Sequence, residues 1–157
     1  MTSDGISTKD WDRVKERAAK IATAVCSNKS AQAKKETKAL LALLDQLQKR
    51  YGELPSVLAT RADYVTSASE SLGLLKKAYA IAEKANDKAN LTYITSSLAE
   101  LYVVDRRDKK NGKRWLAKLR ACLKRHFDKH EFNVYKTLRK MIGASRSPSS
   151  GSSRRGI

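Results

Sequence analysis

The amino-acid sequence predicts an all-α protein of six to seven amphipathic helices, arranged as an antiparallel bundle or as stacked helical hairpins. Apolar residues recur at spacings of three and four along most of the chain, which places them on one face of a helix. The 157 residues include only 7 Gly and 2 Pro, so tight turns are few. The single Asn-Gly dipeptide lies between two helical patterns rather than between alternating apolar runs, so no β-hairpin is predicted.

The first two helices are predicted from a capping residue and from a clear stop. Ser7 precedes an acidic first turn, which is typical of a helix start, and apolar residues follow at helical spacing. The second helix is expected over about Ser30–Tyr51. Gly52 is a suitable C-terminal residue, and Pro55 cannot continue the same helix because it lacks an N–H donor.

The third helix is predicted to begin at about Pro55. The stretch Thr66–Ser71 is rich in Ser and Thr, which favours a break or kink there, although one long helix continuing to about Lys84 is the alternative. Asn86 and Asp87 then end the pattern, and a further helix is expected to follow them.

The last third of the chain is predicted to contain a charged loop at 105–112, followed by helices at about Lys113–Phe127 and His130–Ile142. Residues 143–157 have no apolar periodicity and are rich in Ser and Arg, so they are expected to form a disordered tail. The sequence therefore predicts a single helical domain at 1–142.

The positions of several small residues resemble those of a known family of helical repeats. The segment Ser97–Tyr102 places small residues ahead of a tyrosine, and alanines recur at helical spacing at Ala78, Ala82, Ala85, Ala117 and Ala121. These features resemble the first and second helices of tetratricopeptide hairpins, although similar positions recur here after 38 or 39 residues rather than the family's 34. The resemblance implies stacked helical hairpins.

Positive charge is concentrated at the carboxyl-terminal end of the chain. Residues 105–157 hold 17 Lys/Arg against 4 Asp/Glu, a balance of +13, whereas residues 1–104 hold 16 against 12, a balance of +4; together they give the formal net charge of +17. A local excess of this size attracts polyanions, and each neutralised phosphate releases condensed counterions. The sequence therefore predicts a nucleic-acid-binding protein.

The contact residues are expected on the last two helices and the loop before them. On a helical wheel, the apolar residues of 113–127 fill one arc, and the basic residues form two rows beside it. One row contains Arg114, Lys118 and Arg125, and the other contains Lys113, Arg120 and Lys124. The complete predicted interface is Arg106, Arg107, Lys109, Lys110, Lys113, Arg114, Lys118, Arg120, Lys124, Arg125, Lys136, Arg139 and Lys140.

Aromatic residues guide the choice of target. They make up only 6% of the chain, and Trp115, Phe127 and Phe132 have spacings expected for the core, which leaves little to stack on single-stranded bases. Recognition of an RNA duplex through its backbone, with little sequence specificity, is therefore predicted, and the sequence does not separate RNA from DNA. Because the tail contains Arg146 and an Arg/Ser segment, the chain is similar in type to viral accessory proteins that sequester duplex RNA.

Two other kinds of partner fit the same charge. A helical-repeat adaptor for an acidic protein partner is the alternative function, and attachment to an anionic membrane surface ranks third. The chain has no run of 18 apolar residues, so no transmembrane span is predicted. Its first residues lack an apolar signal segment, so a cytoplasmic or nuclear location is expected; the oligomeric state is not set by the sequence.

No enzyme active site, cofactor site or metal site is predicted. Cys122, His126 and His130 recur every four residues, but neighbouring basic residues would repel a cation, and core packing is the favoured interpretation. No Gly-rich phosphate loop and no nucleophile elbow occur.

Overall fold

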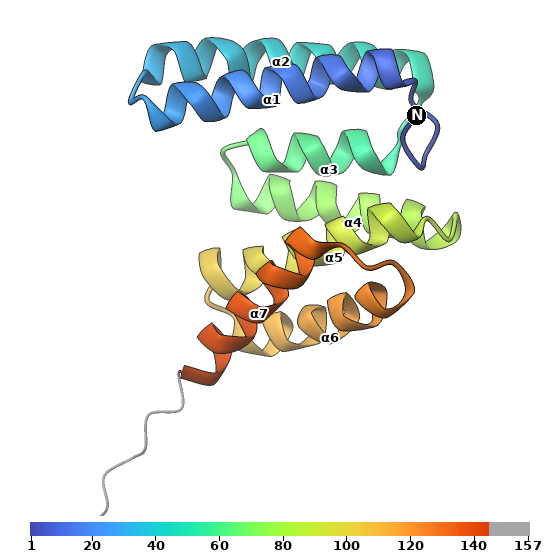
Figure 1. Cartoon of the computed structure of the whole chain (residues 1–157), viewed down its shortest axis with the longest axis vertical. Helices are drawn as coiled ribbons and strands as arrows, with labels where there is room; N and C mark the ends of the chain where they lie inside the picture. The colour runs from blue at the N-terminus through green and yellow to red at the C-terminus, as the bar shows by residue number, and fades with distance from the viewer. Residues whose placement is uncertain (145–157) are drawn as a thin grey trace, which may run out of the picture.

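The structure is a computed structural model that describes residues 1–144, and these form seven α-helices and one short π-helix without a β-strand. In chain order the elements are α1 (Thr8–Cys26), α2 (Ser30–Tyr51), α3 (Pro55–Tyr64), α4 (Ala68–Lys84), α5 (Lys88–Glu100), the π-helix η1 (Leu101–Asp105), α6 (Lys109–Arg125) and α7 (Lys129–Ala144). Figure 1 shows consecutive helices paired as antiparallel hairpins and stacked in layers. The all-α prediction is confirmed. The predicted tail lies outside the described residues from 145 onward, and residues 143 and 144 complete α7.

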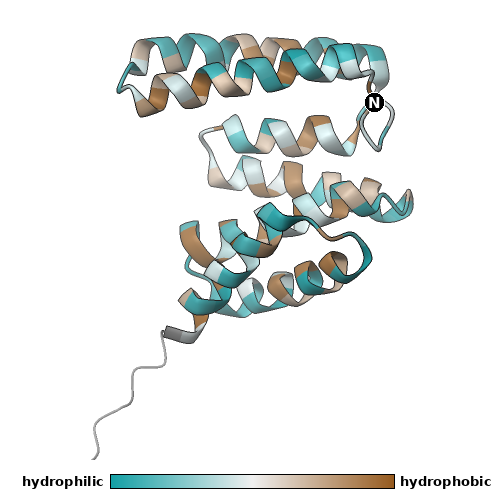
Figure 2. Cartoon of the chain, viewed as in Figure 1, coloured by the Kyte–Doolittle hydropathy of each residue, from teal (hydrophilic) through white to brown (hydrophobic). Residues whose placement is uncertain are grey.

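The core is divided among the layers, which favours stacked hairpins over a single bundle. One buried cluster joins α1 and α2 to Val57 of α3, a second joins α3, α4 and α5, and a third joins Ala99 of α5 to α6 and α7. Leu44, Ile94 and Leu119 are fully buried members of the three clusters. Figure 2 shows apolar residues in every layer rather than gathered at one centre.

Local backbone signals mark the start of α1, the end of α2 and the start of α4. The Asp10 N–H donates to the Ser7 hydroxyl at 3.2 Å, which caps α1 as predicted. The predicted limits of α2 are confirmed, and Gly52 follows it at φ 85°, a conformation that favours glycine. The Glu70 N–H donates to the Ser67 hydroxyl at 3.3 Å and starts α4. The predicted break between α3 and α4 is therefore confirmed, and the single long helix is excluded.

The last three helices all begin at an aspartate that caps the N–H group three residues later. Asp87, Asp108 and Asp128 accept these bonds at 3.1, 3.0 and 3.0 Å. The cap at Asp108 corrects one prediction: residues 109–112 are the first turn of α6, not part of the loop. The chain reaches this cap through η1, where the Arg106 N–H donates to the Leu101 carbonyl five residues back at 3.0 Å.

The amino-terminal loop lies at one edge of the stack (Figure 1) and forms hydrogen bonds to the starts of α3 and α5. The Asp4 carboxylate accepts from the Ser56 N–H at 2.8 Å, at the start of α3. The Ser3 hydroxyl donates to Asp87 at 3.0 Å and accepts from the Asn90 side chain at 3.1 Å, at the start of α5. These bonds help to set the register of α3 and α5 against the start of α1.

Candidate nucleic-acid interface

Helix α6 presents eight Lys or Arg and no Asp or Glu among its 17 residues. Leu116, Leu119 and Leu123 bury its opposite side, so the basic side chains are directed to solvent. Among the described residues, no carboxylate lies within ion-pair distance of these cations. The like charges therefore repel one another without compensation, and a bound polyanion would relieve that repulsion.

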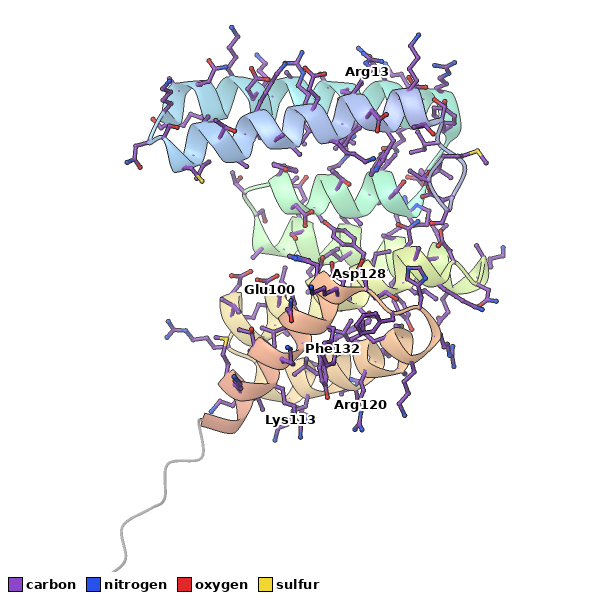
Figure 3. The ribbon with its side chains drawn as sticks, viewed as in Figure 1. Arg13, Glu100, Lys113, Arg120, Asp128 and Phe132 are labelled. Carbon is purple, nitrogen blue, oxygen red and sulfur yellow. The ribbon has the colours of Figure 1, made fainter. Side chains whose placement is uncertain are left out.

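A groove between α6 and α7 collects one of the two predicted basic rows. Its volume is about 530 Å³. Lys113, Arg120 and Lys124 of α6 face Arg139 of α7 across it, and the remaining lining residues are Leu116, Ala117, Ala121, Tyr135 and Ile142. Among residues 1–144, none of the lining side chains is acidic. Figure 3 shows Lys113 and Arg120 extending from α6 away from the other hairpins. We call this the α6–α7 groove.

The second basic row lies outside the groove, and its middle residue, Lys118, contacts Tyr79 of α4. The Lys118 ammonium donates to the Tyr79 hydroxyl at 2.9 Å and lies 4.6 Å from the centre of the Tyr79 ring and 5.2 Å from the Trp115 ring. The Tyr79 hydroxyl in turn donates to the Glu83 carboxylate at 2.7 Å. Lys118 is thus already engaged with α4, and the row it shares with Arg114 and Arg125 does not line the groove.

The other predicted contact residues are dispersed. Arg106, Arg107, Lys109 and Lys110 are exposed where η1 leads into α6, and Lys136 and Lys140 are exposed on α7. The Arg106 guanidinium lies 6.0 Å from the Tyr102 ring centre, and the Lys136 ammonium lies 5.0 Å from the Phe132 ring centre. The structure thus brings four of the thirteen predicted residues together around one groove.

The expected burial of two phenylalanines is wrong. Phe127 is 66% exposed and Phe132 is 37% exposed, whereas Trp115 is half-buried against the core as expected. For Phe127 the reason is that α6 ends at Arg125 and His126 is extended, with φ −144° and ψ 97°, so the Phe127 side chain leaves the apolar arc of α6. The pattern of Asp128 followed three residues later by Glu131 was the signal for a new helix start.

The same helix end separates the three residues that were considered as metal ligands. Cys122 belongs to α6 and His130 to α7, while His126 lies in the connection between them, so they do not share one helix face. Within residues 1–144, no three His, Cys, Asp or Glu side chains are placed to hold a metal ion.

Acidic residues gather at another part of the surface. Asp63, Glu100 and Asp105 line a separate cavity of about 370 Å³ at the junction of α3, α4 and α5. Asp63 as a whole residue is exposed, but its carboxyl group lies against α5, where it accepts a hydrogen bond from the Tyr93 hydroxyl. The loss of water around the carboxyl group raises its pKa to about 6, although the hydrogen bond from Tyr93 acts in the opposite direction. Burial also raises the pKa of Glu131 on α7. These carboxylates do not interrupt the α6–α7 groove.

Comparison with protein-family models, curated proteins and solved structures finds no match for this chain. A functional assignment therefore depends on the chemistry of the α6–α7 groove. Over residues 1–144, none of the helices combines the length and apolar character of a membrane span.

Proposed function

We propose that this protein binds nucleic acid, with RNA as the expected target, by contacting the phosphate backbone at the α6–α7 groove. The observation that carries the proposal is the convergence of Lys113, Arg120, Lys124 and Arg139 on one groove without an acidic neighbour in the described chain. Contacts of this kind supply affinity and position with little sequence specificity.

The spacing of the cations supports a linear polyanion. At 1.5 Å per residue, Lys113 and Arg120 lie about 10.5 Å apart along the helix axis, and Arg120 and Lys124 lie about 6 Å apart. Arg139 faces them from α7, so phosphates can be contacted from both sides of the groove. A charged face that only kept the protein soluble would not need to converge in this way.

Two triple variants of equal charge test the proposal. The groove variant carries Lys113→Gln, Arg120→Gln and Lys124→Gln, and the control carries Arg114→Gln, Lys118→Gln and Arg125→Gln. Both lower the net charge from +17 to +14. If each groove cation neutralises one phosphate, the groove variant should lower the slope of log affinity against log salt by about 2.1 for a single strand or about 2.7 for a duplex.

The same relation gives the size of the affinity loss. At roughly 0.1 M salt the groove variant should bind about 100- to 500-fold more weakly, whereas the control should keep most of its affinity and slope. Fluorescence anisotropy with labelled RNA, at several salt concentrations, measures both quantities. Equal losses in the two variants would refute the groove assignment, and wild-type affinity no better than that of an unrelated basic protein would refute nucleic-acid binding itself.

A second candidate function is an adaptor that binds an acidic amphipathic helix. The apolar floor of the groove favours it, because Leu116, Ala117, Ala121 and Ile142 leave room for an apolar helix face between basic rims. An amphipathic peptide with Glu on both flanks of a Leu stripe tests this function. Tighter and less salt-dependent binding of that peptide than of any RNA would support the adaptor over the nucleic-acid binder.

A further inference from the structure

A row of accessible aromatic rings runs along the α7 side of the groove. The ring centres of Phe127 and Phe132 are 5.7 Å apart, and those of Phe132 and Tyr135 are 6.4 Å apart with an angle of 19° between their planes. Tyr135 itself lines the groove beside Arg139. The row therefore leads from the α6–α7 connection into the basic groove, and Figure 3 shows Phe132 where the two helices lie side by side.

Two of these rings are exposed to solvent, which is uncommon for phenylalanine. Phe127 is 66% exposed and Phe132 is 37% exposed, and neither belongs to the third core cluster. Lys136 lies over the Phe132 ring at 5.0 Å, so a cation also borders the ring row. Aromatic faces beside cations are the combination used to bind unpaired bases and their phosphates together.

Self-association through this surface is disfavoured by its charge. A symmetric dimer would place the same patch of both copies face to face. Two patches that each carry Lys113, Arg120, Lys124 and Arg139 would then face one another, and such a like-charge arrangement is unfavourable. A polyanionic occupant is favoured instead.

The exposed rings also favour a single-stranded ligand over a duplex. In a duplex the base faces are stacked inside the helix, so protruding rings gain nothing from them, whereas a single strand offers free base faces. We propose that the α6–α7 groove binds single-stranded nucleic acid, with bases stacked on Phe127, Phe132 and Tyr135 and phosphates held by the groove cations. This inference rests on the proposed function and replaces the duplex predicted from the sequence, because that prediction assumed that the phenylalanines were buried.

The test compares a ring variant with an exposure-matched control. The ring variant is Phe127→Ala with Phe132→Ala, and the control is Val25→Ala with Val104→Ala, which shortens side chains that are 60% and 40% exposed elsewhere on the surface. The probes are a single-stranded oligouridine, an RNA duplex of equal length, and vesicles of anionic phospholipid. Circular dichroism melting of each variant establishes that the fold is retained.

The wild-type protein should bind the oligouridine more tightly than the duplex. Each ring removed should weaken single-strand binding by about 5- to 150-fold, as for other base–aromatic stacks, without changing the salt slope because no charge is lost. Duplex binding and the control variant should be unaffected.

The outcomes distinguish the inference from the function on which it rests. Tight duplex binding that loses neither affinity nor slope in the ring variant would overturn the single-strand inference and leave nucleic-acid binding intact. Failure to bind either RNA, with ring-dependent binding to the anionic vesicles, would overturn both.

Discussion

Gly73 and Gly112 offer a pair of identical substitutions with different expected effects on stability. Both lie inside helices, α4 and α6. A Cβ atom at position 73 would have no heavy atom within 4 Å, whereas one at position 112 would lie 2.6 Å from a methyl carbon of Val103 in η1. The close approach of α6 to η1 thus requires glycine at 112, although its backbone conformation does not.

The magnitude follows from two opposing contributions. Gly→Ala inside a helix raises the free energy of unfolding by about 1 kcal/mol, and this full gain is expected at position 73. At position 112, overpacking against the stiff, β-branched Val103 lowers it by about 1–3 kcal/mol. Gly112→Ala should therefore be less stable than Gly73→Ala by about 1–3 kcal/mol, which corresponds to about 2–12 °C in melting temperature for a chain of this size.

Urea denaturation followed by tryptophan fluorescence measures both variants, since Trp115 lies on α6. The double variant Gly112→Ala with Val103→Ala should recover part of the loss, because it removes the methyl carbon that the new Cβ meets. Equal stabilisation by the two alanines would refute the close packing of α6 on η1.

Two further predictions concern the acidic cavity and the outer basic row. Because the pKa of Asp63 is raised from 3.8 to about 6 in the folded protein, folding takes up a proton between about pH 4 and 6, and this residue makes the protein less stable as the pH rises through that range. Asp63→Asn should remove that fall when urea midpoints are compared with wild type across the range; parallel curves would contradict the shift. Lys118→Gln should lower stability by about 0.5–1 kcal/mol through loss of its ring contacts while RNA affinity at 0.1 M salt changes by less than about fivefold. A loss in affinity as large as that from Arg120→Gln would show instead that the outer row contacts the ligand.

Much of the fold was predictable because local signals agreed with one another. Helix α2 has the limits predicted from Ser30, Gly52 and Pro55, and the break before α4 coincides with Ser67 in the Ser/Thr-rich stretch. These boundaries depend on backbone chemistry within a few residues, which a single sequence displays.

The start of α6 was missed, although its signal was present. Asp108 caps Asn111 as Asp87 caps Asn90, and each aspartate follows a residue with φ 51°, Arg107 in one case and Asn86 in the other. Asparagine tolerates that left-handed conformation, so the earlier helix start is easier to recognise. At the start of α6 the equivalent residue is Arg107, which does not indicate a left-handed conformation and lies among other charged residues, so this helix start was not recognised.

The candidate site was only half predictable. A helical wheel separates the two rows of α6, but it does not say which row faces α7, because that depends on how the third layer packs. The exposure of Phe127 depends on where α6 ends, and a shift of two residues moves its side chain from the core to solvent. The charge distribution and the helical periodicity could therefore be predicted from the sequence, whereas the groove and the exposure of its rings depend on tertiary packing.

The division of the core into three clusters has a consequence for cooperativity. Each layer contacts mainly the next, so stability is approximately a sum of terms between nearest neighbours, and opening of one end need not melt the other. The α6–α7 groove belongs to the terminal layer, farthest from α1 and α2 (Figure 1). Occupancy there would protect the amides of α6 and α7 from hydrogen exchange most strongly, and that protection should fade toward the first hairpin.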